Sequence, residues 1–188
     1  MAIDTSQFRN GLKIELDGEP FVMTYFQHVK PGKGGAFVRT KVKNLKTGRV
    51  LDRTFRSGEK IDEADVEEKT MQYLYADGDS LVFMDTQTYE QLPFSREQVG
   101  ESIQFLKENL EVQVVFWRDQ PITLELPQFI HATVTQTDPG MKGDTASGAT
   151  KPATLETGAS VQVPLFIKEG ETIRVDTRSG DYIERVNA

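Results

Sequence analysis

The chain has 188 residues and contains no cysteine, and its 22 lysines and arginines against 29 aspartates and glutamates give a formal charge of −7. It therefore cannot form a disulfide, a cysteine-ligated zinc site or a thiolate nucleophile. Because its only two histidines, His28 and His131, also lie far apart in sequence, we predict no metal site, no cofactor and no enzymatic activity.

Changes in residue composition along the chain divide it into three modules, which we predict to be domains at residues 1–64, 65–127 and 128–188. The first ends in an acidic run at residues 62–68, which we interpret as a solvated connector. The second closes at Pro127, and the third has strand patterns on either side of a long Gly-, Thr- and Ser-rich loop at residues 137–152. Each module has enough residues for a small barrel.

Strand signals dominate all three modules. In each one, a pair of residues ending in glycine separates two runs with strand composition, and such a pair is typical of a hairpin because glycine accepts a positive φ. The pairs are Asp17-Gly18 between 12–16 and 21–25, Asp77-Gly78 between 71–75 and 81–84, and Ser179-Gly180 between 173–176 and 182–186.

One segment has a helical pattern instead. Ser95 and Gln98 fit a capping box, and apolar residues at 99, 103, 106 and 110 fall on one helical face, so we predict a helix over 95–110, with Gly100 weakening its start. No strand–helix–strand rhythm repeats, which argues against a parallel α/β sheet. The fold class we predict is all-β: small antiparallel barrels in series with one short helix in the middle domain.

The charges are distributed unevenly. Residues 1–64 carry 12 basic and 8 acidic side chains, residues 65–127 carry 4 and 13, and residues 128–188 carry 6 and 8. Ten cations against two acids lie between Lys30 and Lys60. In the expected strand 36–43, the period of two turns Arg39, Lys41 and Lys43 outward together with Phe37. A row of cations beside an aromatic ring favours a nucleic-acid partner over an ordinary solvated strand.

Residues 30–35, Lys-Pro-Gly-Lys-Gly-Gly, lie between two expected strands and predict a hairpin with an exposed tip. Lys33 is at the apex. A catalytic lysine needs burial or a neighbouring cation to lower its pKa from about 10.4, and a bare tip offers little burial. We therefore expect Lys33 to be a protonated group that inserts into an anionic or polar crevice. The alternative is a mobile turn that happens to hold a lysine.

The loop at residues 137–152 lacks the Gly-Lys-Ser/Thr ending of a phosphate-binding loop and opens no helix after a parallel strand. A nucleotide site of that type is excluded. A flexible surface loop is the simplest interpretation, although the amide of Gly143 and the hydroxyl of Thr145 could contact bases or ribose.

Several motifs together resemble bacterial translation elongation factor P, and they occur in that family's order along the whole chain. They are residues 29–34 (VKPGKG), 36–39 (AFVR), 137–140 (TDPG), 142–145 (KGDT), 151–155 (KPATL) and 175–180 (VDTRSG). The resemblance implies an N-terminal SH3-like (KOW-type) barrel followed by two OB-folds in an elongated L. It also implies a cytoplasmic factor that binds the ribosome between the peptidyl-tRNA and exit sites and relieves stalling at consecutive prolines.

Site residues and partners follow from the same resemblance. Lys33 is the modification and positioning residue that points at the peptidyl-transferase centre, and Pro31, Gly32, Gly34 and Gly35 shape its loop. Implied partners are ribosomal RNA, peptidyl-tRNA, exit-site messenger RNA and an enzyme that modifies Lys33; we expect a monomer and no membrane contact. The cluster of cations described above gives the expected RNA-binding residues of the first domain, Lys30, Arg39, Lys41 and Lys43, and the resemblance implies Gly143, Asp144, Thr145, Tyr182 and Arg185 in the third.

Three alternatives stay open on sequence grounds. The chain could be the longer paralogue of the family, although that protein lacks a Pro-Gly-Lys-Gly tip. It could be a general single-stranded nucleic-acid-binding protein built from OB-folds. An enzyme that uses Lys33 for Schiff-base chemistry is the third.

Overall fold

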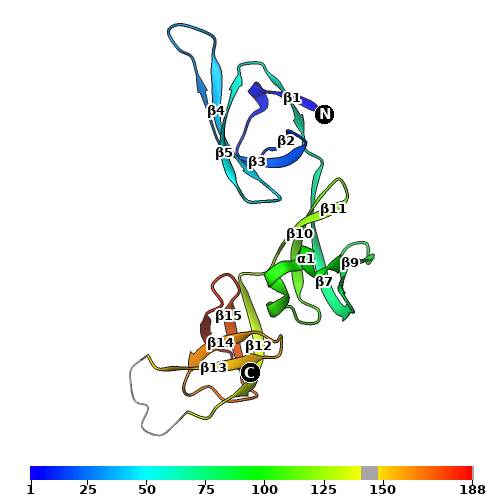
Figure 1. The fold of residues 1–188 in the computed structure, drawn as a ribbon, viewed down its shortest axis with the longest axis vertical. Helices are drawn as coiled ribbons and strands as arrows, with labels where there is room; N and C mark the ends of the chain where they lie inside the picture. Colours follow the sequence, from blue (N-terminus) through cyan, green and yellow to red (C-terminus); the bar gives the residue numbers. More distant parts are fainter. Residues whose placement is uncertain (141–147, 188) are drawn as a thin grey trace. The chain divides into compact units, whose positions relative to one another are not determined.

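The computed structural model describes residues 1–140 and 148–187. Its strands form three sheets, shown in Figure 1, with one short α-helix, which confirms the all-β prediction. The chain divides into two compact units, one of residues 1–69 with 114–123 and the other of residues 70–113 with 124–188. Among the described residues, no helix has the length and apolar character needed to cross a membrane.

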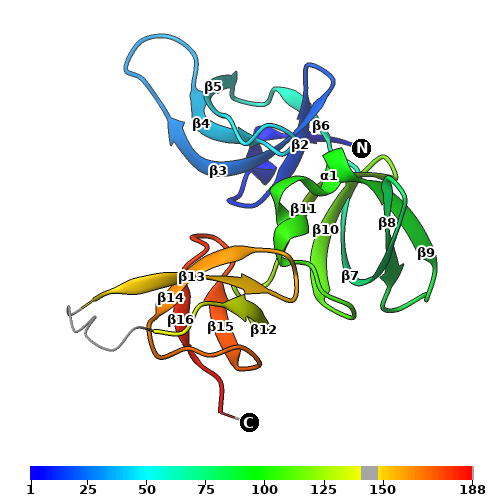
Figure 2. The ribbon, with the colours of Figure 1, turned by 60° about the horizontal axis from the view of Figure 1, so that its bottom comes forward.

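The first sheet has six strands in the order β1-β6-β2-β3-β4-β5 and curls around a core of apolar side chains that includes Ile14, Met23, Val38 and Val42. A single 3-10 turn, Thr5–Gln7, follows β1 and is capped by Asp4. Figure 2 shows the strands β3 and β4 continuing past the rest of the sheet into a long loop. The strands are β1 (Ala2–Asp4), β2 (Lys13–Leu16), β3 (Glu19–Val29), β4 (Phe37–Asn44), β5 (Val50–Arg56) and β6 (Lys60–Glu63).

Strand β4 has the alternation that its sequence predicts. Val38, Thr40 and Val42 are buried, whereas Arg39, Lys41 and Lys43 are exposed. The hairpin between β2 and β3 is also confirmed, with Asp17 at φ 53° and Gly18 at φ 78°. The acidic run is a connector only in part, because Asp62 and Glu63 belong to β6 and the next strand begins at Val66.

The second sheet has five strands in the order β11-β10-β7-β8-β9, and β7 and β10 each pass from one compact unit into the other. Within it, Phe83 and Phe94 stack with ring centroids 4.8 Å apart. The expected hairpin joins β7 to β8, and Asp77 pairs with Ser80. The strands are β7 (Val66–Asp77), β8 (Ser80–Asp85), β9 (Gln91–Ser95), β10 (Glu111–Trp117) and β11 (Gln120–Glu125).

The helix starts as predicted and ends much earlier than predicted. Ser95 and Gln98 form the capping box at the start of α1 (Arg96–Val99), but Gly100 takes φ 66° and ends it. A 3-10 helix, Gly100–Phe105, follows, and residues 106–110 are not helical, so the prediction of a helix to residue 110 is wrong. The physical reason is the positive φ of Gly100, which ends the α-helical hydrogen bonding; the residues that follow then place Phe105 in the core of the third sheet, with Leu110 packed against it.

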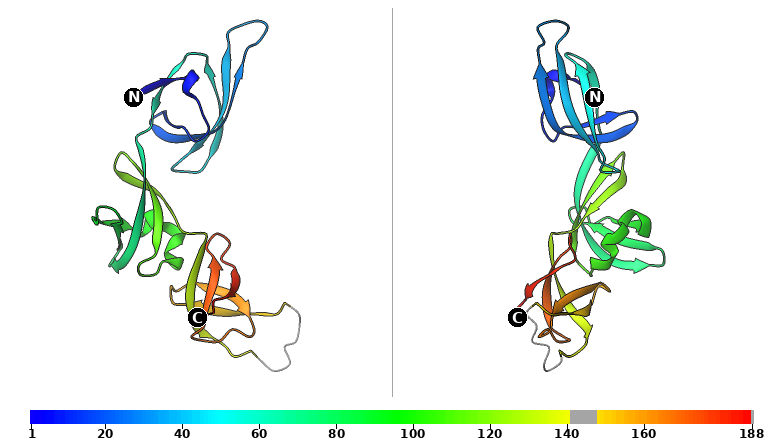
Figure 3. Two further views of the ribbon diagram at one scale, coloured as in Figure 1. Left: turned by 180° about the vertical axis from the view of Figure 1, so that it is seen from behind. Right: turned by 60° about the vertical axis from the view of Figure 1, so that its left-hand side comes forward.

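The third sheet has five strands in the order β14-β13-β12-β15-β16. Its central strand β12 pairs with β15 through residues 129–133 and with β13 through residues 134–137, so the sheet turns a corner. The curled sheet, coloured yellow to red in Figure 3, encloses a core that includes Val163, Ile167 and Ile173. The strands are β12 (Phe129–Thr137), β13 (Thr150–Leu155), β14 (Ser160–Pro164), β15 (Thr172–Asp176) and β16 (Tyr182–Arg185), and Gly180 lies in the predicted β15–β16 hairpin.

Candidate functional site

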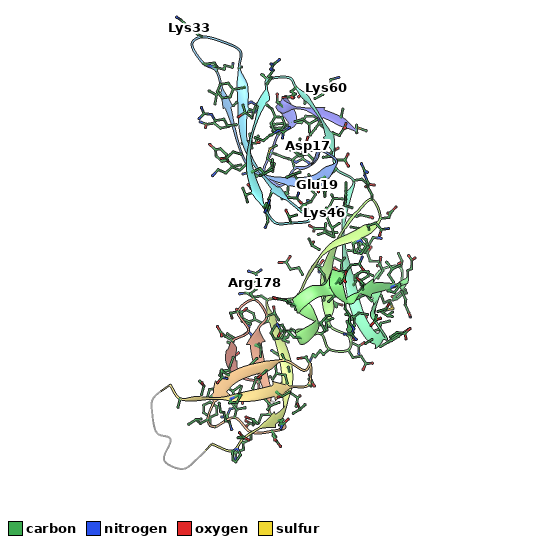
Figure 4. The ribbon with its side chains drawn as sticks, in the orientation of Figure 1. Asp17, Glu19, Lys33, Lys46, Lys60 and Arg178 are labelled. Atoms are coloured by element: carbon green, nitrogen blue, oxygen red, sulfur yellow. The ribbon has the colours of Figure 1, made fainter. Side chains whose placement is uncertain are left out.

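Lys33 lies at the end of the loop that joins β3 to β4. The two strands pair as far as Val29 and Phe37, and the residues between them leave the sheet. Figure 4 shows Lys33 at the far end of this extension, and Lys30, Pro31, Gly32, Lys33, Gly34 and Gly35 are all exposed. Within the described part of the chain, Lys33 forms no salt bridge. The ammonium group is therefore free to contact another molecule.

The glycines of this tip have two different structural roles. Gly34 has φ 95°, a left-handed conformation that residues with a side chain rarely adopt. Gly32 and Gly35 have no such φ, and a Cβ atom added at either would meet nothing within 4 Å. The fold itself thus requires glycine only at Gly34. The other two keep the tip narrow, which suits entry into a confined space.

Cations of the first sheet share one outward face with the base of the tip. Register places Arg39 between Gln27 and Thr54, and Lys41 between Tyr25 and Asp52, so these residues form adjacent cross-strand rows. The Arg39 guanidinium carbon lies 5.5 Å from the centre of the Phe37 ring. Lys43 is exposed further along the same strand. The structure thus brings together Arg39, Lys41 and Lys43 and leaves Lys30 in the adjoining loop.

Two residues that line a hollow beside these cations were not singled out from the sequence. A hollow of about 240 Å³ on the outer surface is lined by Tyr25 and Arg53 as well as by Arg39, Lys41 and Asp52. Tyr25 points outward because the register shifts by one residue between Met23 and Tyr25. No periodicity within β3 alone predicts that bulge. Arg53 lies opposite the buried Thr40 in the β4–β5 register, so the row of outward cations does not lead to it; its guanidinium pairs with Asp17 at 3.5 Å.

The third-sheet residues have a separate environment. Arg185 is held by Glu171, with Nη1 3.3 Å from Oε1, and its guanidinium carbon lies 4.9 Å from the centre of the Phe166 ring. Burial raises the pKa of the Tyr182 phenol above its usual value. A hydrogen bond from the backbone N–H of Lys168 lowers the pKa of Glu171, and Arg185 adds to this effect. Gly143, Asp144 and Thr145 lie outside the described residues.

The exposed groups of the tip and of the adjacent face are suited to binding another molecule. Among residues 1–140 and 148–187, no three His, Asp or Glu side chains gather in a way that could hold a metal ion. The tip presents the exposed ammonium groups of Lys30 and Lys33, and the outward face of β3 and β4 presents guanidinium and ammonium groups with exposed aromatic carbon. Such groups recognise phosphate and bases.

Three family models match consecutive parts of the chain. Residues 4–61 match "Elongation factor P (EF-P) KOW-like domain", residues 66–124 match "Elongation factor P (EF-P) OB domain", and residues 126–185 match "Elongation factor P, C-terminal". Together they cover nearly all of the sequence and agree with the division into three sheets.

Whole-chain relatives carry the same name. The chain is 55% identical over 183 residues to Elongation factor P of a Synechococcus species and to that of Moorella thermoacetica, in each case covering 97% of this chain and 99% of the relative. These relatives are named as translation factors and not as enzymes. A solved structure of eukaryotic translation initiation factor 5A from Methanococcus jannaschii, 24% identical, covers 64% of this chain and 90% of its own with a TM-score of 0.52, which shows a shared fold.

Proposed function

Because the chain belongs to the elongation factor P family of translation elongation factors, we propose that it binds the ribosome between the peptidyl-tRNA and exit sites and promotes peptide-bond formation at consecutive prolines. The observation that carries this proposal is the exposed Lys33 at the end of the narrow extension formed by β3 and β4. The same two strands carry the outward-facing cations next to the base of the tip. That geometry suits insertion of one positive charge into an RNA-lined cavity.

The mechanism we propose is positional. The ribosome supplies the reacting groups, and the tip holds the end of the peptidyl-tRNA near a geometry that allows attack, which lowers the entropic part of the barrier. Proline is a poor reactant in such a step because its ring fixes φ and restricts the chain. The Lys33 side chain, alone or extended by a covalent modification, would contact the tRNA end.

Other residues would hold the factor in place. We assign contacts with the RNA backbone to Lys30, Arg39, Lys41 and Lys43 in the first domain, since phosphate contacts fix position and register. In the third domain we assign RNA contacts to Gly143, Asp144, Thr145, Tyr182 and Arg185. The proposed domains are residues 1–64, 65–127 and 128–188, acting in the cytoplasm as a monomer.

Lys33 is also the residue we propose as the target of a modifying enzyme. Its exposure and the bare glycines on either side leave the amine open to approach. Pro31 and Gly34 would give the loop a defined form that such an enzyme could recognise. An intact mass of the protein from its native host, followed by mapping of the tip peptide, identifies any added group.

The proposal is tested by peptide synthesis on ribosomes in a purified translation system. Adding the protein should speed synthesis of a peptide with three consecutive prolines and leave a proline-free control peptide unchanged. Salt-sensitive pelleting with ribosomes should accompany this effect. Equal binding to ribosomes and to random oligonucleotides, with no effect on proline runs, would instead support a general single-strand binder.

A further inference from the structure

The turn that joins β10 to β11 belongs to the same compact unit as the first sheet. Residues 114–123 group with residues 1–69, although their strands pair within the second sheet. The Arg118 amide donates a 3.3 Å hydrogen bond to the carbonyl of Asp65, which lies between β6 and β7. Both β10 and β11 run on out of this unit. Contacts that hold the turn on the first sheet therefore also hold the strands by which the chain leaves it.

The backbone of this turn is strained. Only Arg118 and Asp119 separate β10 from β11, and they have φ of 51° and 63°. A two-residue hairpin turn of this kind favours Asn-Gly or Asp-Gly, because both residues must take a left-handed conformation. Arginine lacks the short polar side chain that lets asparagine or aspartate bond to the local backbone there. A residue persists in such a conformation when its surroundings hold it.

The Arg118 side chain is held by strand β2. Its guanidinium pairs with the carboxylate of Glu15, whose side chain is only 19% exposed, and its guanidinium carbon lies 4.8 Å from the centre of the Trp117 ring. Arginine suits this place because its planar group can pair with a carboxylate and also stack on an aromatic ring. Glu15 pairs with Pro20 of β3 on one side and with Asp62 of β6 on the other. The carboxylate is thus carried by a strand inside the sheet.

Trp117 gives the turn a second attachment to the first sheet. The ammonium group of Lys46, between β4 and β5, lies 5.2 Å from the centre of the Trp117 ring, a cation–π distance. The segment that carries Lys46 is ordered, because the buried Asn44 accepts hydrogen bonds from the amides of Lys46 and Thr47. We call Arg118, Glu15, Trp117 and Lys46 the Arg118 clamp; all four belong to one compact unit.

The clamp is far from the tip. Figure 4 shows Lys46 and Lys33 at opposite ends of the first sheet. An ion pair whose arginine is 62% exposed adds little to the free energy of unfolding. Loss of this pair should therefore change the position of the turn more than the stability of the fold.

We propose that Arg118 and Glu15 are positioning residues, which hold the β10–β11 turn against the first sheet and so join the strands that leave this unit firmly to the sheet that carries Lys33. The inference rests on the proposed function, because a tip that acts by its position needs a firmly held sheet behind it. Neither residue need contact RNA for this role.

The clamp itself is tested without ribosomes. Trp117 is the only tryptophan of the chain, so its fluorescence reports on the turn. Glu15→Arg and Arg118→Glu each bring like charges together and should raise the quenching of Trp117 by acrylamide. The double variant restores opposite charges and should be quenched less than either single variant. The matched control is Glu125→Arg, which brings like charges together at the exposed Arg178–Glu125 pair of the other unit and should leave the quenching unchanged.

The positioning role is tested by synthesis of a proline-run peptide at saturating factor. Glu15→Arg and Arg118→Glu should each lower the stimulated rate by about 2- to 10-fold, the weight of one partly exposed ion pair. The double variant should recover most of the rate, and Glu125→Arg should keep all of it. Recovery separates the ion pair from a direct RNA contact of Arg118, which reversal of Glu15 would not restore.

Arg118→Asn guards against misfolding of the reversed variants. Asparagine accepts the left-handed φ of this turn, so the melting temperature should not fall, whereas quenching should rise and the stimulated rate should drop as in the single reversals. Unchanged quenching in the single variants, or a double variant as slow as they are, would overturn the clamp. If the unaltered protein stimulates proline runs and the single variants do so equally well, only the positioning role is wrong. If the unaltered protein gives no stimulation, the proposed function fails and the positioning role fails with it.

Discussion

Lys33→Ala is expected to abolish stimulation of proline-run synthesis while leaving the fold intact. The side chain packs on nothing, so the melting temperature should change by no more than about 1–2 °C, as for other exposed substitutions. If the tip positions the tRNA end, its loss should slow the stimulated step by on the order of 10²-fold, the penalty for a misplaced reactant. Time courses of synthesis at saturating factor, with protein from its native host, measure this rate.

A matched control comes from the same barrel. Lys60 is an exposed lysine in β6, outside the tip, and Lys60→Ala should keep full stimulation. Ribosome pelleting of both variants shows whether Lys33 acts on the reaction or on binding. An unfolded Lys33→Ala protein, or equal losses in the two variants, would remove Lys33 from its proposed role.

Arg39→Gln combined with Lys41→Gln is expected to weaken ribosome binding by about 10- to 100-fold near physiological salt. Both cations lie on the outward face of the first sheet. Each phosphate contact that is lost should also reduce the slope of log affinity against log salt by about 0.7 to 0.9. Titration of labelled protein with ribosomes at several salt concentrations measures both quantities.

The control for this pair removes two charges elsewhere in the same domain. Arg9 and Lys60 are both exposed and belong to neither β3, β4 nor β5. Arg9→Gln with Lys60→Gln therefore matches the net charge and should change the affinity far less. If the two double variants weaken binding equally, the factor is directed to RNA by its overall charge and not by the outward face that carries Arg39 and Lys41.

Much of the first barrel and its tip could be predicted from local patterns. Strand β4 alternates between buried Val38, Thr40 and Val42 and exposed cations, and a period of two is visible in any such strand. The turn at Gly18 and the bare tip around Lys33 follow from glycine's tolerance of positive φ and the lack of apolar residues. These features depend on neighbours in sequence, so sequence is enough to find them.

The structural features that could not be predicted from the sequence depend on contacts between segments that are distant in the chain. The helix after Ser95 ends at Gly100, a residue that the sequence marks as weakening it, whereas the burial of Phe105 in the core of the third sheet depends on residues outside 95–110. Tyr25 turns outward through a register shift that only pairing with β4 defines.

The central claim is that the Lys33 tip reaches the peptidyl-transferase centre, and a tethered cleavage reagent tests it most directly. The chain has no cysteine, so Lys33→Cys supplies a single attachment point for an iron chelate that generates hydroxyl radicals, with Lys60→Cys as the control. With both proteins pelleting with ribosomes, we expect the position 33 probe, and not the position 60 probe, to cleave ribosomal RNA of the peptidyl-transferase centre. Cleavage elsewhere, or none at that centre from a bound Lys33→Cys protein, would contradict the claim.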